Sequence, residues 1–146
     1  MHLPPVDQSE FQSKVFIHIR GGDYLENTVN REFYGTTNQT YYQQSLRHVL
    51  SENEKQQFIL FTNDMNLSEE YLGSQMDNIT IDESQNSLEA LAKMRACSGA
   101  IMANSSFSWW GAFLQKNKGI QIAPKKWNSK MEPKKAFIYP PYVIRF

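Results

Sequence analysis

A basic and an acidic side chain flank two glycines near the start of the sequence. The apolar run 15–17 predicts a buried strand, and His18, Arg20 and Asp23 stand at or beyond its end, around Gly21 and Gly22. Strand ends of this kind bind anionic ligands in open α/β sheets. Glycines let the backbone approach a ligand, and a guanidinium offers a planar fork of donors suited to a phosphate. The turn therefore predicts a diphosphate site, with an internal ion pair between Arg20 and Asp23 as the alternative.

A second polar group, Asn104, Ser105 and Ser106, directly precedes a segment that we expect to be helical. A serine there can cap the first turn, and the free amides carry the positive end of the helix dipole. A phosphate can bind at such a helix start without a lysine. An ordinary helix cap is the alternative. The aromatic residues that follow are expected to belong to the core, namely Phe107, Trp109, Trp110 and Phe113.

Short apolar runs alternate with helical stretches along the chain. The predicted strands are residues 15–20, 58–62, 79–81, 100–103 and 119–122, and the predicted helices between them are 40–52, 67–72, 88–97 and 107–116. This alternation predicts an α/β fold, a Rossmann-like parallel sheet with flanking helices. The tail after Ala123 contains four prolines and is expected to cover the surface as irregular segments.

Polar residues follow four of these predicted strands. They are His18, Arg20 and Asp23 after the first, Thr62, Asn63 and Asp64 after the second, Asp82 and Glu83 after the third, and Asn104 to Ser106 after the fourth. Because the carboxyl ends of parallel strands share one edge of the sheet, we expect these side chains to converge there.

Composition excludes several classes of function. The 146 residues fit one domain, and the 15 basic residues balance the 15 acidic ones, so no broad field favours nucleic acid. A single cysteine, Cys97, excludes an internal disulfide framework and indicates a reducing, cytoplasmic setting. Neither an Asp-x-Asp sequence nor a metal-ligand spacing occurs, so we expect no metal and no cofactor.

Two motifs resemble those of a known family. Residues 18–24, His-Ile-Arg-Gly-Gly-Asp-Tyr, resemble the H-x-R-x-G-D-Y motif of the α-1,2-fucosyltransferases of glycosyltransferase family 11. Residues 104–112 resemble their N-S-[ST]-F-S-W-W-G-A motif, and residues 61–64 are similar to their F-[ST]-[DN]-D element. A Met-x-x-Cys element ending at Cys97 and a Pro-x-x-Trp element ending at Trp127 also fall where the family has them.

The resemblance implies the donor-binding, C-terminal half of a GT-B glycosyltransferase. Residues 14–146 correspond to the GDP-fucose-binding Rossmann-like domain, and residues 1–13 form an N-terminal segment. The family's G-G-L-G-N-Q motif has no counterpart before Lys14, so the acceptor domain is expected to be absent from this chain. The implied activity is inverting transfer of L-fucose from GDP-fucose to a galactoside in surface polysaccharide or lipopolysaccharide synthesis. The alternative is a non-catalytic nucleotide-sugar-binding domain or a truncated, inactive transferase fragment.

The resemblance also implies roles for single residues. Arg20 is expected to bind the β-phosphate and to stabilise the departing diphosphate in the transition state. The implied donor-binding residues are His18, Arg20, Asp23, Asn104, Ser105 and Ser106, with Asp64 and Glu89 as further candidates. His18 has two equal alternatives. It either contacts the ribose or base, or it is a buried histidine whose hydrogen bonds are made within the protein. Glu26, Glu32 or a residue outside the chain could be the catalytic base, so none is assigned.

Two positions depart from the family's pattern. Gly21 stands where many members have a second arginine, and Ala90 stands where they often have an aspartate that is a plausible guanine ligand. The expected partners are GDP-fucose and a galactose-containing glycan, without nucleic acid. Self-association through the surface of the missing domain is a further expectation. The protein is expected in the cytoplasm, with a peripheral position at the inner face of a bacterial membrane as an option, since residues 116–135 are locally basic.

Overall fold

One parallel sheet forms the centre of the molecule. The computed structural model of the chain describes residues 2–22, 28–29, 32, 37–131 and 138–146. Within these residues the strands lie in the order β3-β2-β1-β4-β5-β6, and every neighbouring pair is parallel. The strands are β1 Lys14–Ile19, β2 Gln57–Thr62, β3 Ile79–Ile81, β4 Gly99–Ile101, β5 Gln121–Ala123 and β6 Ile144–Arg145. The predicted α/β Rossmann-like fold is confirmed.

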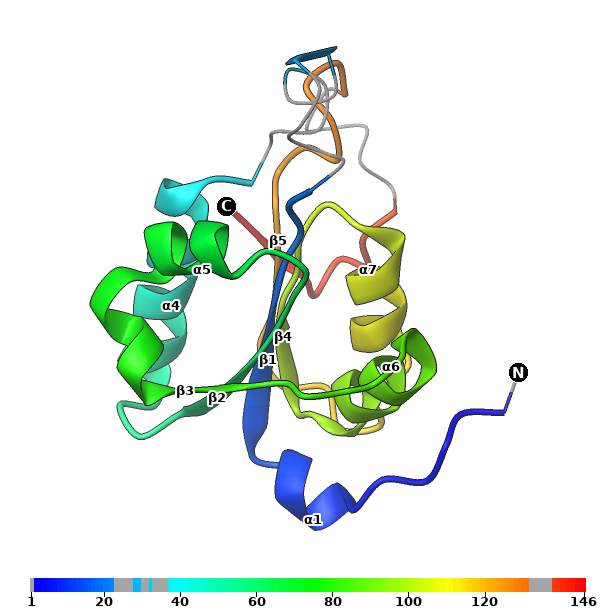
Figure 1. Cartoon of the computed structure of the whole chain (residues 1–146). Coiled ribbons are helices and arrows are strands. Elements are labelled where there is room, and N and C mark those ends of the chain that lie inside the picture. Colours follow the sequence, from blue (N-terminus) through cyan, green and yellow to red (C-terminus); the bar gives the residue numbers. More distant parts are fainter. Residues whose placement is uncertain (1, 23–27, 30–31, 33–36, 132–137) are drawn as a thin grey trace.

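Helices cover both faces of this sheet. Figure 1 shows α4 (Gln39–Glu52) and α5 (Met65–Leu72) on one face, and α6 (Ser87–Ala96) and α7 (Ser106–Phe113) on the other. Each of these helices follows a capping side chain that accepts a hydrogen bond from a first-turn amide, namely Asn38, Asp64, Asn86 and Ser105. A short helix, α1 (Gln8–Phe11), precedes β1, and a 3-10 helix, η1 (Gly73–Asn78), precedes β3.

The period of two along the strands divides the core between the two faces. In β1, Val15, Ile17 and Ile19 join the hydrophobic cluster that contains Tyr42 of α4. Phe16 joins the opposite cluster, which contains Met94 of α6 and Ala112 of α7. Because alternate residues of a strand face the same side, His18 and Arg20 follow Phe16 toward α6 and α7.

The N-terminal segment packs onto this domain. Phe11 of α1 is buried in the same cluster as Phe16, and Val6 packs against that cluster. Residues 6 and 11 therefore contribute to the core of the Rossmann-like domain that begins its sheet at Lys14.

The C-terminal tail contains a strand, so the prediction of irregular structure throughout it is wrong. Residues of β6 pair with β5, Ile122 opposite Ile144 and Ala123 opposite Arg145. The tail is held at this edge because the Lys125 amide donates to the Phe146 carbonyl and the Phe146 amide donates to the Ala123 carbonyl. Two residues are too short a run for an apolar pattern to reveal.

The aromatic residues of α7 are not all core, which corrects a second prediction. Trp110 is 49% exposed and Phe113 is 43% exposed, whereas Phe107 and Trp109 are partly buried against the core. The buried face of α7 consists of the small residues Ser108, Gly111 and Ala112, spaced i, i+3, i+4. A Cβ at Gly111 would lie 2.8 Å from the Met94 sulfur, so close packing against α6 turns the larger side chains outward.

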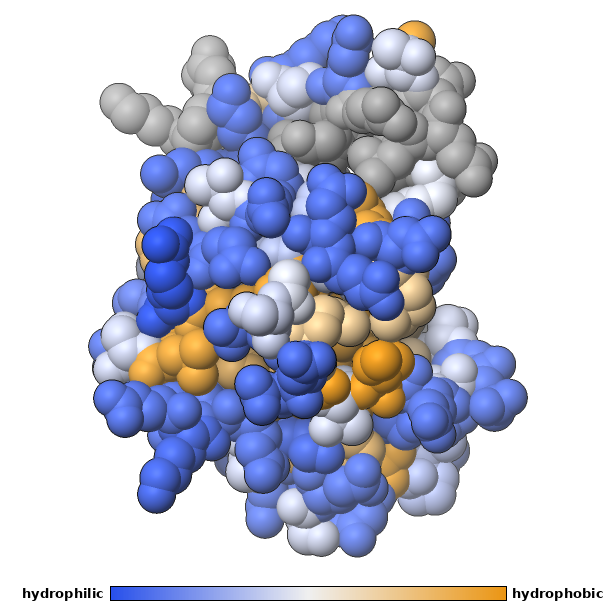
Figure 2. Space-filling model, turned by 60° about the vertical axis from the view of Figure 1, so that its left-hand side comes forward, coloured by the Kyte–Doolittle hydropathy of each residue, from blue (hydrophilic) through white to orange (hydrophobic). Residues whose placement is uncertain are grey.

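The face of the molecule seen in Figure 2 is mostly hydrophilic. Figure 2, turned so that the α4 and α5 side comes forward, shows an apolar band between hydrophilic regions. Ile81 at the end of β3 and Leu88 in α6 are each 44% exposed. In the described part of the chain, no helix combines the length and the apolar character that crossing a membrane requires.

Candidate functional site

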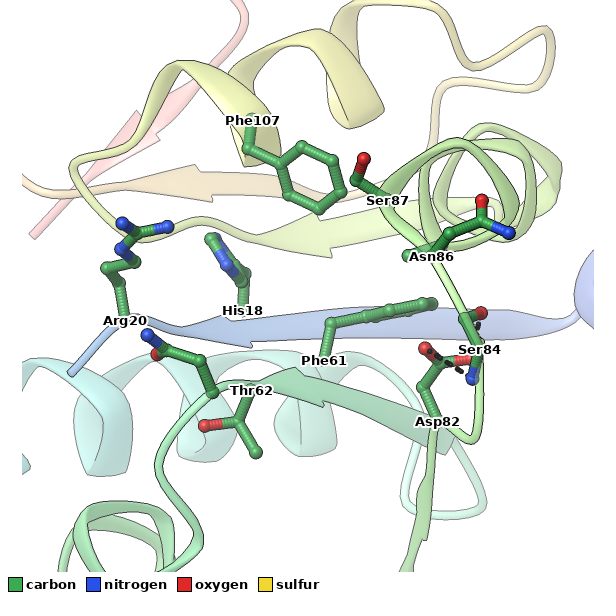
Figure 3. Close-up of a pocket in the computed structure, with 11 residues that line it drawn as sticks. His18, Arg20, Phe61, Thr62, Asp82, Ser84, Asn86, Ser87 and Phe107 are labelled. Carbon is green, nitrogen blue, oxygen red and sulfur yellow. Dashed lines mark hydrogen bonds between the residues drawn. The ribbon is translucent and has the colours of Figure 1, made fainter. Parts of the chain in front are cut away.

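A cavity of about 350 Å³ lies at the carboxyl ends of β1, β2 and β3. Figure 3 shows the side chains of its wall, which come from those strand ends, from the connection between β3 and α6, and from the first turns of α6 and α7. The described residues that line it are His18, Arg20, Phe61, Thr62, Asn63, Asp82, Ser84, Asn86, Ser87, Ala90 and Phe107. Three of the four predicted polar strand ends therefore meet here.

Strand register explains why one row of side chains lines this cavity. His18 of β1 pairs with Phe61 of β2. Ile81 of β3 pairs with Leu60, and the Asp82 amide donates to the Leu60 carbonyl at 2.8 Å, which extends the β2–β3 pairing by one residue. Asp82 thus stands beside Phe61, and the three side chains share the face covered by α6 and α7.

His18 is buried, but its polar atoms are not all satisfied. The residue is 5% exposed, and no described group hydrogen-bonds its Nδ1. Burial, together with the nearby Arg20 guanidinium, lowers the pKa of His18 to about 3. The imidazole is therefore neutral near pH 7, and its Nδ1 is a buried atom without a hydrogen-bond partner among the described residues. Contact of His18 with a ribose or base stays a prediction.

Arg20 lies at one end of the cavity, beside His18 (Figure 3). The turn that follows it is held by Asn63, whose Oδ1 accepts from the Gly21 amide at 2.9 Å and whose Nδ2 donates to the Gly21 carbonyl at 3.4 Å. Gly22 has a φ of 64°, which favours glycine. These contacts fix the backbone from which the Arg20 side chain extends, as a preorganised anion site requires.

Gly21 leaves room for Asp64. A Cβ at position 21 would lie 2.5 Å from Asp64 Oδ2 and 2.6 Å from Asp64 Cβ. Asp64 itself caps α5, because its Oδ1 accepts from the Leu67 amide at 3.0 Å. An arginine at position 21 would require this cap to move, and the Asp64 side chain is not among those that line the cavity.

Asp82 provides a carboxylate near the end of the cavity opposite Arg20 (Figure 3). Its side chain is 8% exposed and forms an ion pair with Lys93 of α6 at 3.1 Å. Ser84 donates its hydroxyl to Oδ1 at 2.8 Å and its amide to Oδ2 at 3.2 Å. The carboxylate is thus held in one orientation by three donors.

Glu89 is not among the described residues that line the cavity. Its carboxylate accepts from the Gln85 amide at 3.0 Å and pairs with Lys93 at 3.1 Å. The Gln85 amide, followed by Lys93, holds the pKa of Glu89 below its ordinary value. Ala90, the next residue, lines the cavity instead.

The β4–α7 corner, residues 104–106, uses its polar side chains differently. Ser105 Oγ accepts from the Phe107 amide at 3.3 Å, and Asn104 Nδ2 donates to the Trp127 carbonyl at 3.0 Å. Ser106 is exposed and lines two other depressions. None of the three is among the residues that line the cavity, although Phe107 is.

Of the other predicted residues, Asp23 and Glu26 lie outside the described residues, and Glu32 is exposed. Sequence reasoning did not single out Phe61, Ser84, Asn86, Ser87 or Phe107 as site residues, although they line the cavity. Phe61 lines the cavity because it lies in register with His18, a pairing that a single sequence does not define.

The Cys97 thiol and the possible metal ligands are two other potential sources of chemistry. Burial raises the pKa of the Cys97 thiol to about 12, so it is not an activated nucleophile. In the described ranges, no group of three or more His, Cys, Asp or Glu side chains is placed to hold a metal ion. The expectation of a metal-independent site stays a prediction.

Comparisons with known proteins agree with the motifs. The model of a family described as "Glycosyl transferase family 11" matches residues 6–143. The chain is 32% identical over 114 residues to the O-antigen biosynthesis glycosyltransferase WbnK of Escherichia coli, covering 76% of this chain and 38% of that protein. It is 32% identical over 124 residues to an alpha-1,2-colitosyltransferase of Escherichia coli, covering 82% and 43%. The matched part thus spans about two fifths of each relative's length, 38% and 43%. No solved structure matches the chain.

Proposed function

The chain belongs to glycosyl transferase family 11, and from this we propose that it is the donor-binding part of an inverting α-1,2-fucosyltransferase. The proposed reaction moves L-fucose from GDP-fucose to a galactoside in surface polysaccharide or lipopolysaccharide synthesis. One relative is named for O-antigen biosynthesis and the other is named an alpha-1,2-colitosyltransferase, which supports this setting.

The observation that carries the proposal is the position of Arg20. The strand order places β1 beside β4, and the connections from these two strands lead to helices on opposite faces of the sheet. Ligands of open α/β sheets bind outside the carboxyl ends of the strands at such a switch point. Arg20 follows β1 at this point and lines the cavity.

The chemistry of sugar transfer gives this arginine its role. The bond between the anomeric carbon and the β-phosphate oxygen breaks while the acceptor hydroxyl oxygen bonds that carbon from the opposite face, and the hydroxyl proton passes to a base. Negative charge builds on the leaving GDP, and a fixed guanidinium stabilises that charge most in the transition state. A charged hydrogen bond is worth about 1.5–3 kcal/mol, or about one to two decades in rate.

The cavity wall supports a further part of this proposal. A neutral His18 in the cavity wall suits a ribose hydroxyl, which donates and accepts but carries no charge. The contacts proposed for Asp23, Asp64, Glu89 and residues 104–106 stay predictions, as does the absence of a metal. The catalytic base is not assigned.

Calorimetric titration of the chain with GDP tests the proposal. We expect saturable binding by the wild-type chain, and we expect Arg20→Ala to weaken it by about 10- to 100-fold through loss of the charged contact. Arg47→Ala is the matched control, because Arg47 is an exposed arginine of α4 that does not line the cavity. A folded wild-type chain that shows no binding at millimolar GDP would contradict the proposal.

A further inference from the structure

We propose that Asp82 reads the base of the bound nucleotide and selects guanine through the donor groups on the N1 and N2 edge of that base. This inference rests on the proposed function, because it assigns a role within the same cavity. The residue lies at the end of β3, whereas the diphosphate is assigned to Arg20 at the end of β1.

The cavity is polarised in a way that orients a nucleotide. Figure 3 shows Arg20 toward one end and Asp82 toward the other, with the rings of His18, Phe61 and Phe107 between them. The His18 and Phe107 rings lie 5.7 Å apart between centroids. A diphosphate is attracted to the cationic end and repelled by the carboxylate, so a nucleotide bound at Arg20 extends its base toward Asp82. The aromatic rings supply the apolar surface that a flat base prefers.

The hydrogen bonds of Asp82 leave it able to accept one more donor. A carboxylate has about four acceptor positions. Oδ1 accepts from Lys93 and from the Ser84 hydroxyl, and Oδ2 accepts from the Ser84 amide. Within the described part of the chain, one position on Oδ2 therefore remains. Because the side chain is only 8% exposed, a ligand that fills this position must be a donor or leave the charge poorly compensated.

Lys93 holds this carboxylate in place through the 3.1 Å ion pair. Burial lowers the pKa of the Lys93 ammonium, but its hydrogen bonds to Glu89 and Asp82 outweigh burial, so the net pKa is raised and the ammonium stays protonated. Together with the two bonds from Ser84, the contact with Lys93 fixes the direction in which Asp82 presents its remaining acceptor position.

Guanine fits such an acceptor better than the other bases do. Its N1–H and its 2-amino group are adjacent donors. Uracil has a single N–H between two carbonyl oxygens, which a carboxylate repels, and in adenine the 6-amino donor stands beside the acceptor N1. A base that presents a carbonyl or a bare ring nitrogen to Oδ2 loses the hydrogen bond and gains repulsion.

Titration of the wild-type chain with GDP, ADP, UDP and xanthosine diphosphate provides the first test. Xanthine keeps N1–H but has a carbonyl in place of the 2-amino group. We expect GDP to bind at least about tenfold more tightly than each of the other three, since each of their bases places an acceptor beside or in place of the donor that faces Oδ2. Binding of xanthosine diphosphate or ADP as tight as that of GDP overturns the inference, and this arm needs no variant.

The Asp82→Asn variant provides the second test. Its amide can donate to the 2-carbonyl of xanthine. We therefore expect the affinity for GDP to fall by about 10- to 100-fold and the variant to prefer xanthosine diphosphate. A structural role for Asp82 would not reverse this preference. Glu83→Gln is the control of equal charge change, because Glu83 is exposed and does not line the cavity.

The outcomes separate the two proposals. GDP binding that Arg20→Ala weakens but Asp82→Asn leaves unchanged, or weakens equally for all four nucleotides, overturns the role of Asp82 and leaves the proposed function standing. A folded wild-type chain that binds no GDP contradicts the proposed function itself. Circular dichroism of each variant shows that it is folded.

Discussion

Two regions contain residues of the family-like motifs, and their polar side chains act differently. One is the cavity at the ends of β1, β2 and β3, and the other is the corner between β4 and α7. In the cavity, the buried Nδ1 of His18 has no hydrogen-bond partner among the described residues, and Asp82 keeps an open acceptor position. In the corner, Ser105 caps α7 and Asn104 binds the Trp127 carbonyl.

Polar side chains at a strand end can therefore either bind a ligand or stabilise the fold. Unsatisfied polar groups in a buried wall cost stability and persist where a ligand compensates them. Satisfied groups stabilise the helix start or the loop that they bond. We therefore expect changes in the cavity to alter nucleotide affinity and changes in the corner to alter the free energy of unfolding.

The largest expected effect on stability comes from acidifying the cavity. The pKa of His18 is about 3 when folded and 6.5 by ordinary value, so between these values the unfolded chain binds more protons. Stability is therefore full above pH 6.5 and falls as the pH drops toward 3. Denaturant unfolding should show a loss of about 2 kcal/mol between pH 6.5 and pH 4.5, at a slope of at most about 1.4 kcal/mol per unit.

The His18→Gln variant sharpens this prediction, because glutamine does not titrate. Its stability should vary much less over the same pH range. An equal slope in the variant and the wild-type chain would show that other groups cause the acid sensitivity.

A methyl group at Gly21 is the next largest perturbation. Gly21→Ala places a Cβ within 3 Å of three Asp64 atoms and should cost about 1–3 kcal/mol of unfolding free energy. The substitution should also lower the affinity for GDP, because Arg20 lies directly before this turn. Gly73→Ala is a control with a φ of 54° and, among the described residues, no neighbour within 4 Å of the new Cβ, so backbone strain should cost about 1–3 kcal/mol without changing GDP affinity. Equal effects of the two variants on affinity would contradict the assigned role of the turn.

Removing the corner's cap is a smaller change. Ser105→Ala should lower the free energy of unfolding by about 1 kcal/mol through loss of the bond to the Phe107 amide. Calorimetry should show less than about a twofold change in GDP affinity, because the Ser105 side chain does not line the cavity. A tenfold loss of affinity at unchanged stability would instead assign the Ser105 hydroxyl to the donor.

A change of similar size is expected at Trp110. This side chain is 49% exposed and its ring packs edge-to-face against those of Trp109 and Phe113, so Trp110→Ser should lower the free energy of unfolding by about 1 kcal/mol. Thermal or denaturant unfolding measures this directly. A loss of several kcal/mol in the free energy of unfolding would instead show that the tryptophan belongs to the core.

The sequence predicts the sheet well because its strand cores are continuous apolar runs, as in residues 58–61 of β2. It could not reveal β6, whose two residues carry no pattern, nor the outward aromatics of α7, since Gly111 and Met94 decide that orientation through tertiary contact. For the site, the glycine turn and the strand-end position of Asp82 were predictable from topology. The row formed by His18, Phe61 and Asp82 depends on register, which a single sequence does not define.

A nuclear magnetic resonance titration of the isotopically labelled chain with GDP locates the nucleotide site directly. Assigned backbone amides report which region binds the nucleotide. The proposed site predicts the largest shifts at residues that line the cavity, among them Arg20, Phe61, Asp82 and Ser87. Shifts confined to residues 104–106 and Trp127, with the cavity amides unchanged, would contradict it.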